Sequence, residues 1–241
     1  MSFQEFLNES INDRGLFKAV FVIGPPGSGK SYTLSKLTGN IEPRVINTDI
    51  ALEFLSKKLS IPATSENWRP VFRDTTKRMT SAKLFSYLDG MLPLFIDGTS
   101  NNTSNILQRA GILESLGYDV AMIFVDTDIE TAKKRAKERA LKINREVDEE
   151  FIEKVYKASA VNKEYFKKKF TTFFEIKNND GELTDEIILN AYRKVQSFYT
   201  SPLNNPIGVA NIEKIKGENQ KYLTPSIVSK EKLENKISTW Y

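Results

Sequence analysis

The chain has 241 residues, 40% of them apolar, and a net charge of +4. This is enough for one α/β domain with a large core, or for one domain plus an appendage. It contains no cysteine and no histidine, which excludes disulfide frameworks and thiolate metal sites and leaves acid–base chemistry to Asp, Glu, Lys or water. No apolar run approaches the ~20 residues that span a bilayer, and the N-terminus shows no secretory signal. We therefore expect a cytoplasmic protein without a membrane partner.

Residues 1–16 predict a short amphipathic helix that Gly15 can end. Its apolar residues recur at helical spacing: Phe3, Phe6, Leu7 and Ile11. Packing of this helix against the edge of a sheet is the interpretation we favour.

Residues 17–31 join a short strand to a glycine-rich loop. The run from Phe17 to Ile23 is apolar, β-branched and aromatic, which is typical of a buried parallel strand. The next eight residues fit the pattern G-x-x-x-x-G-K-[ST] without departure: Gly24, Pro25, Pro26, Gly27, Ser28, Gly29, Lys30 and Ser31. Glycines let a backbone wrap a polyphosphate, and the loop amides and the following helix start attract anionic oxygens. This loop, with Tyr32 just beyond it, is predicted to bind the phosphates of a nucleotide.

Two side chains of the motif have separate expected roles. Lys30 would reach the β- and γ-phosphates of ATP, and the Ser31 hydroxyl would bind Mg²⁺. A chance glycine-rich turn, or a true loop that has lost catalysis, are the alternatives that the motif leaves open.

The second strand, Arg44 to Asn47, is followed by Asp49. Open α/β sheets bind their ligands just past the carboxyl ends of strands, so Asp49 is a candidate for orienting a substrate. Thr48 or Asp49 could instead cap a helix that runs to about Leu59, with Leu52, Leu55 and Leu59 on its inner face. Both interpretations stay open.

Residues 60–90 carry a cationic stripe. Arg69, Arg73 and Lys77 recur every four residues, so one helix would present them on one face. The stripe is either a solvated face or an arm that holds an anionic substrate group such as phosphate. A further helix is expected from about Ser81 to Asp89.

The run from Leu92 to Thr99 predicts a strand that ends in Asp97-Gly98-Thr99. A carboxylate at the tip of an apolar strand is typical of the Walker B position, where it holds Mg²⁺ directly or through water. An ordinary Asp-Gly turn is the alternative. A helix from Asn105 to Leu116 should follow.

Tyr118 to Val125 predicts another buried strand, and Ile129 to Ala140 a helix. On that helix Arg135 and Arg139 share one face and could clamp phosphoryl oxygens, unless they are simply solvated. A lid-like loop is expected at 141–147. It should precede a long helix (148–170), a last strand (171–176), a turn at Asn178 and a closing helix to Tyr199.

The residue pattern of the sequence changes after residue 200. Proline and asparagine interrupt residues 201–208, and the chain ends in Trp240 and Tyr241. We expect one domain at 1–200 and an extended tail at 201–241. The tail would dock on the body or on a protein partner, or be disordered.

Taken in order, these motifs resemble the zeta-toxin and polynucleotide-kinase branch of P-loop kinases over residues 17–200. The resemblance rests on Gly24–Ser31, Asn47-Thr-Asp49, Phe95-Ile-Asp-Gly-Thr99, Gly117-Tyr118 before Ile123-Phe-Val125, the Arg135/Arg139 pair and Asn144-Arg145-Glu-Val147. It implies a three-layer sandwich with a five-stranded parallel sheet in the order 2-3-1-4-5 and a helical lid. It also implies transfer of the γ-phosphoryl group of ATP, with Mg²⁺, to a hydroxyl.

The resemblance also implies roles for single residues. Asp49 would orient or deprotonate the acceptor hydroxyl, and Arg135, Arg139 and Arg145 would neutralise the transferring phosphate. Asn178 would lie near adenine. Arg69, Arg73 and Thr99 are the remaining candidates for contact with the acceptor.

The acceptor stays open in the sequence because the stretch after Asp49 lacks the early basic residue of the family, and Asp97 stands where Glu is frequent. A nucleotide sugar, a nucleoside or a nucleic-acid 5′-hydroxyl are the candidates, the last favoured by basic stretches at Arg69–Lys83 and Lys163–Lys169. The alternative function is an ATP-binding interaction module of a larger assembly.

Overall fold

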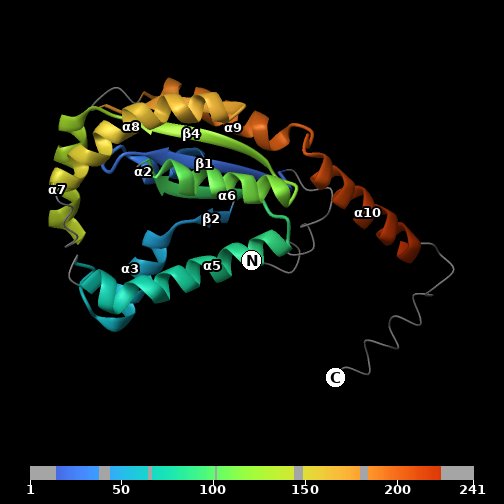
Figure 1. Ribbon diagram of the computed structural model, residues 1–241, viewed down its shortest axis with the longest axis horizontal. Coiled ribbons are helices and arrows are strands. Elements are labelled where there is room, and N and C mark those ends of the chain that lie inside the picture. Colours follow the sequence, from blue (N-terminus) through green and yellow to red (C-terminus); the bar gives the residue numbers. More distant parts are fainter. Residues whose placement is uncertain are drawn as a thin grey trace.

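The computed structural model describes residues 15–37, 44–64, 67–100, 102–143, 149–179 and 184–223. Within these ranges five strands form one parallel sheet in the order β2-β3-β1-β4-β5, which confirms the predicted topology (Figure 1). The strands are β1 (Lys18–Gly24), β2 (Arg44–Ile46), β3 (Leu94–Thr99), β4 (Asp119–Asp126) and β5 (Thr172–Lys177).

Four of the described helices cover the two faces of the sheet, α2 and α9 on one face and α6 and α8 on the other. The helical elements are α2 (Lys30–Leu37), α3 (Thr48–Leu59), the π-helical turn η1 (Trp68–Phe72), α5 (Arg73–Asp89), α6 (Thr103–Ser115), α7 (Ile129–Ile143), α8 (Glu149–Lys169), α9 (Asp185–Thr200) and α10 (Pro206–Leu223). On one face α6 and α8 pack against Phe21 and Ile23. On the other, α2 and α9 pack against Val20 and Val22. The result is the expected three-layer sandwich.

The central strand explains why the site forms where it does. Every residue of β1 is buried, because helices cover both faces and strands flank both edges. Its register with β3 pairs Val22 with Asp97 and Gly24 with Thr99. The carboxyl ends of β1 and β3 therefore deliver the glycine-rich loop and Asp97 to the same edge of the sheet.

A helical arm made of α3, η1 and α5 stands beside the β2 edge (Figure 1). The prediction that one helix presents the whole cationic stripe is wrong in one respect. Arg69 lies in the π-helical turn, where the Arg73 amide donates to the Trp68 carbonyl, and α5 begins only at Arg73. The wider turn interrupts the four-residue spacing, so Arg69 and Arg73 do not continue one α-helical stripe.

The region after residue 200 differs from the expected irregular tail, because α10 forms there. Asn205 accepts a hydrogen bond from the Ile207 amide at 3.0 Å, and Pro206 is the first residue of the helix. The sequence pattern was interpreted as a break in regular structure at these residues, although proline is favourable in the first turn of a helix. Helix α7 also runs three residues beyond Ala140, into the expected loop.

Some expectations concern residues outside the described ranges. These are the amphipathic segment 1–14, residues 144–148 with Arg145, and the end of the chain after Leu223. In the part of the chain that the structure describes, no helix combines the length and apolarity that crossing a membrane requires.

Candidate active site

The glycines of the loop are required by close packing around it. A Cβ on Gly24 would lie 2.2 Å from the Val125 carbonyl oxygen, and one on Gly27 would lie 2.3 Å from the Ala132 carbonyl oxygen. Gly29 has a φ of +84° and would meet an amide nitrogen at 2.2 Å. The loop is therefore held between the end of β4, helix α7 and the residue after β5, and these three glycine positions have no space for a side chain.

Lys30 and Ser28 give this loop its polar lining. The Lys30 ammonium donates to the carbonyl oxygens of Gly24 and Pro25 at 3.0 and 2.9 Å, so it lies across the loop at the start of α2. Ser28 is fully buried, and its hydroxyl has no hydrogen-bond partner among the described residues. A Cβ on Gly24 would lie 2.8 Å from this hydroxyl, so the Ser28 side chain packs inside the loop.

Ser31 and Tyr32 follow on the first turn of α2, and both are exposed. The Ser31 hydroxyl is therefore accessible to an ion at the mouth of the loop. Pro26 is partly exposed and Pro25 buried.

Asn178 and Arg135 are brought together beneath the loop. Asn178 is only 4% exposed, and its side-chain amide donates to the Ser28 carbonyl at 2.7 Å. The Arg135 guanidinium donates to the Asn178 carbonyl at 2.8 Å and lies near Gly29. The site thus places a guanidinium from α7 beside the predicted phosphates, held by a residue 43 positions later in the chain.

Asn47 bonds to both acidic residues of the site, to the side chain of Asp97 and the backbone of Asp49, and sequence reasoning did not assign it a role. Its side-chain nitrogen donates to Asp97 at 2.7 Å, and its side-chain oxygen accepts from the Asp49 amide at 2.7 Å. Asn47 is therefore the N-cap of α3, in place of Thr48 or Asp49. Asp49 lies in the first helical turn, half-buried. An Asn directly after a strand and two residues before an Asp was the available signal.

The donors for a metal ion are few. In the described ranges no group of three or more acidic side chains could hold an ion. Ser31 and Asp97 fit Mg²⁺ only as a pair of oxygen ligands that phosphate oxygens and water would complete, which is the usual arrangement for this ion.

The segment after β3 is held in place by a second set of residues, to which the sequence analysis assigned no role. Thr99 ends β3 exposed, and the next residue, Ser100, is buried. The hydroxyls of Ser100 and Ser159 are in hydrogen-bond contact, and Asn162 donates to the Ser100 carbonyl at 2.6 Å. Helix α8 therefore fixes the position of Thr99. The sequence feature that could have indicated this contact was a serine and an asparagine three residues apart on the inner face of α8.

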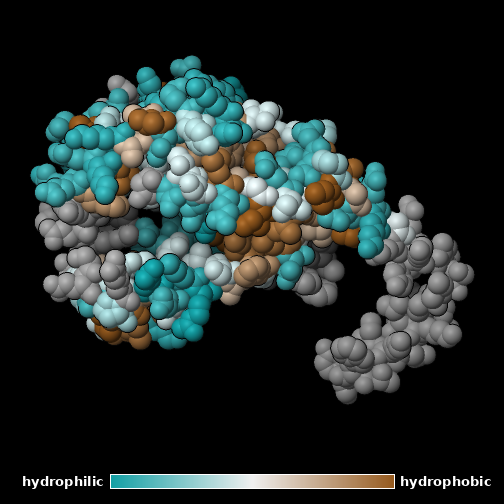
Figure 2. Space-filling view, viewed as in Figure 1, coloured by the Kyte–Doolittle hydropathy of each residue, from teal (hydrophilic) through white to brown (hydrophobic). Residues whose placement is uncertain are grey.

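The remaining candidates lie on the arm and the lid. Arg73 is exposed at the start of α5. Arg69 and Arg139 lie on described backbone, η1 and α7, but their side chains are outside the description, as is all of Arg145. Figure 2 shows a hollow between the α3–α5 arm and the rest of the domain.

Ion pairs join the two lid helices. Lys133 on α7 contacts Glu153 on α8 at 2.5 Å, and Lys137 contacts Glu149 at 2.7 Å. The hydrogen bond from Lys133 lowers the pKa of Glu153, and the one from Lys137 lowers the pKa of Glu149. Lys163, one of the basic residues expected to meet nucleic acid, instead pairs with Asp126 and Glu175.

Comparison with known proteins agrees with this geometry. The family model described as "Zeta toxin" matches residues 7–186. A search of curated proteins finds no match. Two solved structures share the fold: a provisionally assigned kinase from Chloroflexus aurantiacus (TM-score 0.55, 14% identity, 76% of this chain and 98% of that one) and a chain of the PezAT toxin–antitoxin system of Streptococcus pneumoniae (TM-score 0.51, 14% identity, 89% and 93%).

The family match covers well over half of the chain, and the sheet order, the glycine-rich loop and the residues around it are those expected of such a fold. The protein therefore belongs to the zeta toxin family and has the fold of P-loop kinases.

Proposed function

We propose that the protein is a kinase that transfers the γ-phosphoryl group of ATP to a hydroxyl group, with Mg²⁺ as cofactor. The observation that supports this most strongly is the glycine cradle, with Lys30 lying across it and Asp97 on the adjacent strand. Phosphoryl transfer needs positioning and charge neutralisation more than covalent chemistry, and these residues supply both without histidine or cysteine.

Each residue has a distinct role in the proposed reaction. The loop amides and Lys30 bind the β- and γ-phosphates, and Arg135 neutralises charge that develops on the transferring group. Bound Mg²⁺, held by Ser31 and Asp97, would shield the phosphate oxygens from one another. Asn47 keeps the Asp97 carboxylate in place through its 2.7 Å hydrogen bond.

Asp49 acts on the acceptor. The acceptor oxygen attacks the γ-phosphorus, the bond from that phosphorus to the β,γ-bridging oxygen breaks, and ADP leaves. The hydroxyl proton passes to the Asp49 carboxylate, which the α3 cap places at the tip of β2. We propose that the acceptor enters beside this carboxylate, on the side where Arg73 of α5 and Thr99 of β3 are exposed. Arg69, Arg139 and Arg145 are proposed to contribute further positive charge.

The acceptor class is testable with labelled ATP. Purified protein would be incubated with labelled ATP, Mg²⁺ and, separately, nucleosides, nucleotide sugars and 5′-hydroxyl oligonucleotides. We expect label to appear on one class and to depend on Asp49, so that Asp49→Asn loses transfer while still binding ATP. Transfer by the Asp49→Asn variant at the parent rate would contradict the role of Asp49 as base. If an oligonucleotide is the acceptor, its binding should weaken steeply with added salt.

The alternative, an ATP-binding interaction module, makes a different prediction for the tail. The connection before α10 is built into the body, because the buried Lys18–Asp119 pair also binds Ser201 and the Asn204 and Asn205 amides. A fair truncation therefore ends at Leu223. Loss of partner binding with unchanged ATP turnover would indicate a tethered enzyme. ATP binding without transfer to any acceptor would favour the module.

A further inference from the structure

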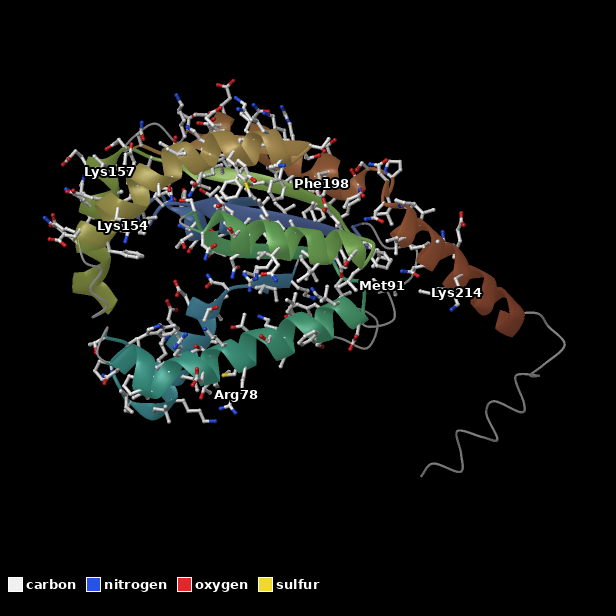
Figure 3. All side chains as sticks on the ribbon, viewed as in Figure 1. Arg78, Met91, Lys154, Lys157, Phe198 and Lys214 are labelled. Carbon is white, nitrogen blue, oxygen red and sulfur yellow. The ribbon has the colours of Figure 1, made fainter. Side chains whose placement is uncertain are left out.

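A groove on the side of the molecule away from the catalytic loop is unexplained by the proposed kinase activity. It has a volume of about 460 Å³ and lies between the end of α5, the end of α6 and the middle of α10. Its apolar lining includes Phe17, Phe85, Leu88, Met91, Leu116 and Ile215. Met91 and Lys214 mark its two sides (Figure 3), and Figure 2 shows hydrophobic surface gathered between α6 and α10.

The lining is unusually exposed for large apolar side chains. Phe85 is 66% exposed and Leu116 is 43% exposed, although each would gain free energy from burial. Two lining residues, Phe17 and Met91, also have a positive φ of 55°, which bulky residues rarely adopt. The Phe17 amide donates to the Met91 carbonyl at 2.9 Å. The backbone is thus held in an uncommon conformation at the place where the chain enters β1 beside the groove.

We propose that the N-terminal segment, residues 1–14, occupies this groove with its apolar face. The segment is followed directly by Gly15, only two residues before Phe17, which is itself part of the groove wall. In sequence its apolar residues fall on one face of a helix and its acidic residues, Glu5, Glu9 and Asp13, on another. Fourteen residues of helix would span about 21 Å, enough to cross the groove.

Chain connectivity favours this occupant over the other end of the chain. The C-terminal aromatics lie 17 and 18 residues beyond Leu223, where α10 ends, so they would have to fold back along that helix. The N-terminal segment begins at the groove wall, and its loop-closure cost is therefore the smaller one.

Occupancy of the groove would connect the segment to the arm. Helix α5 supplies Phe85 and Leu88 to the groove at one end and begins with Arg73 at the other. A segment packed on Phe85 and Leu88 would fix the end of α5 and thereby the position of the arm relative to the sheet. This role is independent of which molecule accepts the phosphoryl group.

The absence of cysteine makes a direct test available in the full chain. The pair Ser10→Cys and Asp89→Cys joins the apolar face of the segment to the rim of the groove without removing an apolar residue. Asn12→Cys with Asp89→Cys is the matched control, because helical spacing over 1–14 would put Asn12 on the opposite face, although it is nearer to the groove in sequence. Trp240→Cys with Asp89→Cys tests the other terminus. Disulfide formation under mild oxidation would be followed by mass under non-reducing conditions.

We expect the Ser10 pair to close within one chain about tenfold faster than the Asn12 pair, as a docked segment raises the effective concentration of one face only. Adding Leu7→Asp to the Ser10 pair should remove this advantage. The proposal would be overturned by equal rates for the two faces or by a rate that Leu7→Asp leaves unchanged. Disulfides that form mainly between chains would assign the groove to a second copy instead. Faster closure of the Trp240 pair would assign it to the C-terminal segment.

Discussion

The two sides of the catalytic edge are built in different ways. Around the glycine-rich loop, backbone meets backbone so closely that Gly24 and Gly27 admit no Cβ, and Asn178 is buried beneath. On the arm, the buried residues of α5 are Thr76 and Thr80, whose hydroxyls donate to carbonyls of the preceding turn. The loop side is fixed by close backbone packing, whereas α5 meets the core mainly through partly buried side chains, Leu84, Tyr87 and Leu88.

This difference matches what each side must do. A nucleotide triphosphate always presents the same anionic oxygens, so a rigid cradle preorganised for them contributes most to catalysis. Exposed positions of α5, such as Arg73, can change at little cost to the core. Substitutions in the loop should therefore cost more than substitutions at the exposed positions of α5.

The largest effect is expected at Lys30. Lys30→Ala removes the cation that lies across the loop, and we expect phosphoryl transfer to fall on the order of a thousandfold. The measurement is turnover of labelled ATP. Lys36→Ala, at the exposed end of the same helix, is the control and should leave turnover within about twofold. A Lys30→Ala variant that works at the parent rate would refute the mechanism.

A smaller loss is expected at Asp97. Asp97→Asn keeps an oxygen that Asn47 can bind but removes the charge that attracts Mg²⁺, so turnover should fall roughly a hundredfold and need more Mg²⁺. Titration of Mg²⁺ at fixed ATP checks this, with exposed Asp89→Asn as control. An unchanged Mg²⁺ dependence would remove Asp97 from the metal site.

The next prediction tests how tightly the glycine-rich loop at 24–31 is packed. Gly29→Ala would place a methyl group 2.2 Å from the Asn178 amide nitrogen at a φ of +84°, and should lower the free energy of unfolding by about 2 kcal/mol. Gly111→Ala in α6, where a Cβ meets nothing within 4 Å, should instead raise it by about 0.5 to 1 kcal/mol. Urea unfolding curves measure both. Equal effects would mean that the loop is not tightly packed.

On the arm, Arg73→Ala should change acceptor binding only. We expect KM for the acceptor to rise about fivefold to tenfold with kcat nearly constant, since an exposed guanidinium contributes about 1 kcal/mol to binding an anion. Arg78→Ala, on another face of α5 (Figure 3), is the control. A fall in kcat larger than the rise in KM would place Arg73 in the chemical step.

The smallest effect is a pH dependence of the lid. Because Lys133 lowers the pKa of Glu153 below its ordinary value of 4.5, the pair stabilises the folded state above that value, and its contribution is lost as pH falls through the lowered pKa. Glu153→Gln should be slightly less stable than the parent at pH 7, and the difference should shrink as the pH falls below 4.5. A difference that stays constant or grows on acidification would contradict this origin.

The sequence predicted the loop side of the molecule well for a physical reason. The pattern from Gly24 to Ser31 is local, and it encodes both the turn and the binding amides. The alternating strands and helices then allow one parallel sheet, and the family resemblance supplied its order. The start of α10 was misjudged because Pro206 was taken as a break when Asn205 makes it a helix start.

Contacts between distant segments could not be foreseen. Asn47 with Asp97, Asn178 with Ser28, and Asn162 with Ser100 join residues 50, 150 and 62 positions apart. A local pattern can draw attention to an asparagine but does not indicate its distant partner, since an asparagine can serve equally in a turn, a cap or a solvated face. The contacts that position the catalytic groups therefore emerged only from the folded structure, while the catalytic candidates themselves were visible in the sequence.

Calorimetric titration of the purified protein with ATP, ADP and AMP in the presence of Mg²⁺ tests the central claim most directly. If the cradle at 24–31 grips β- and γ-phosphates, ATP and ADP should bind at least about a hundredfold more tightly than AMP, which lacks both groups. Equal affinity for the three nucleotides, or no binding of ATP at all, would contradict the account.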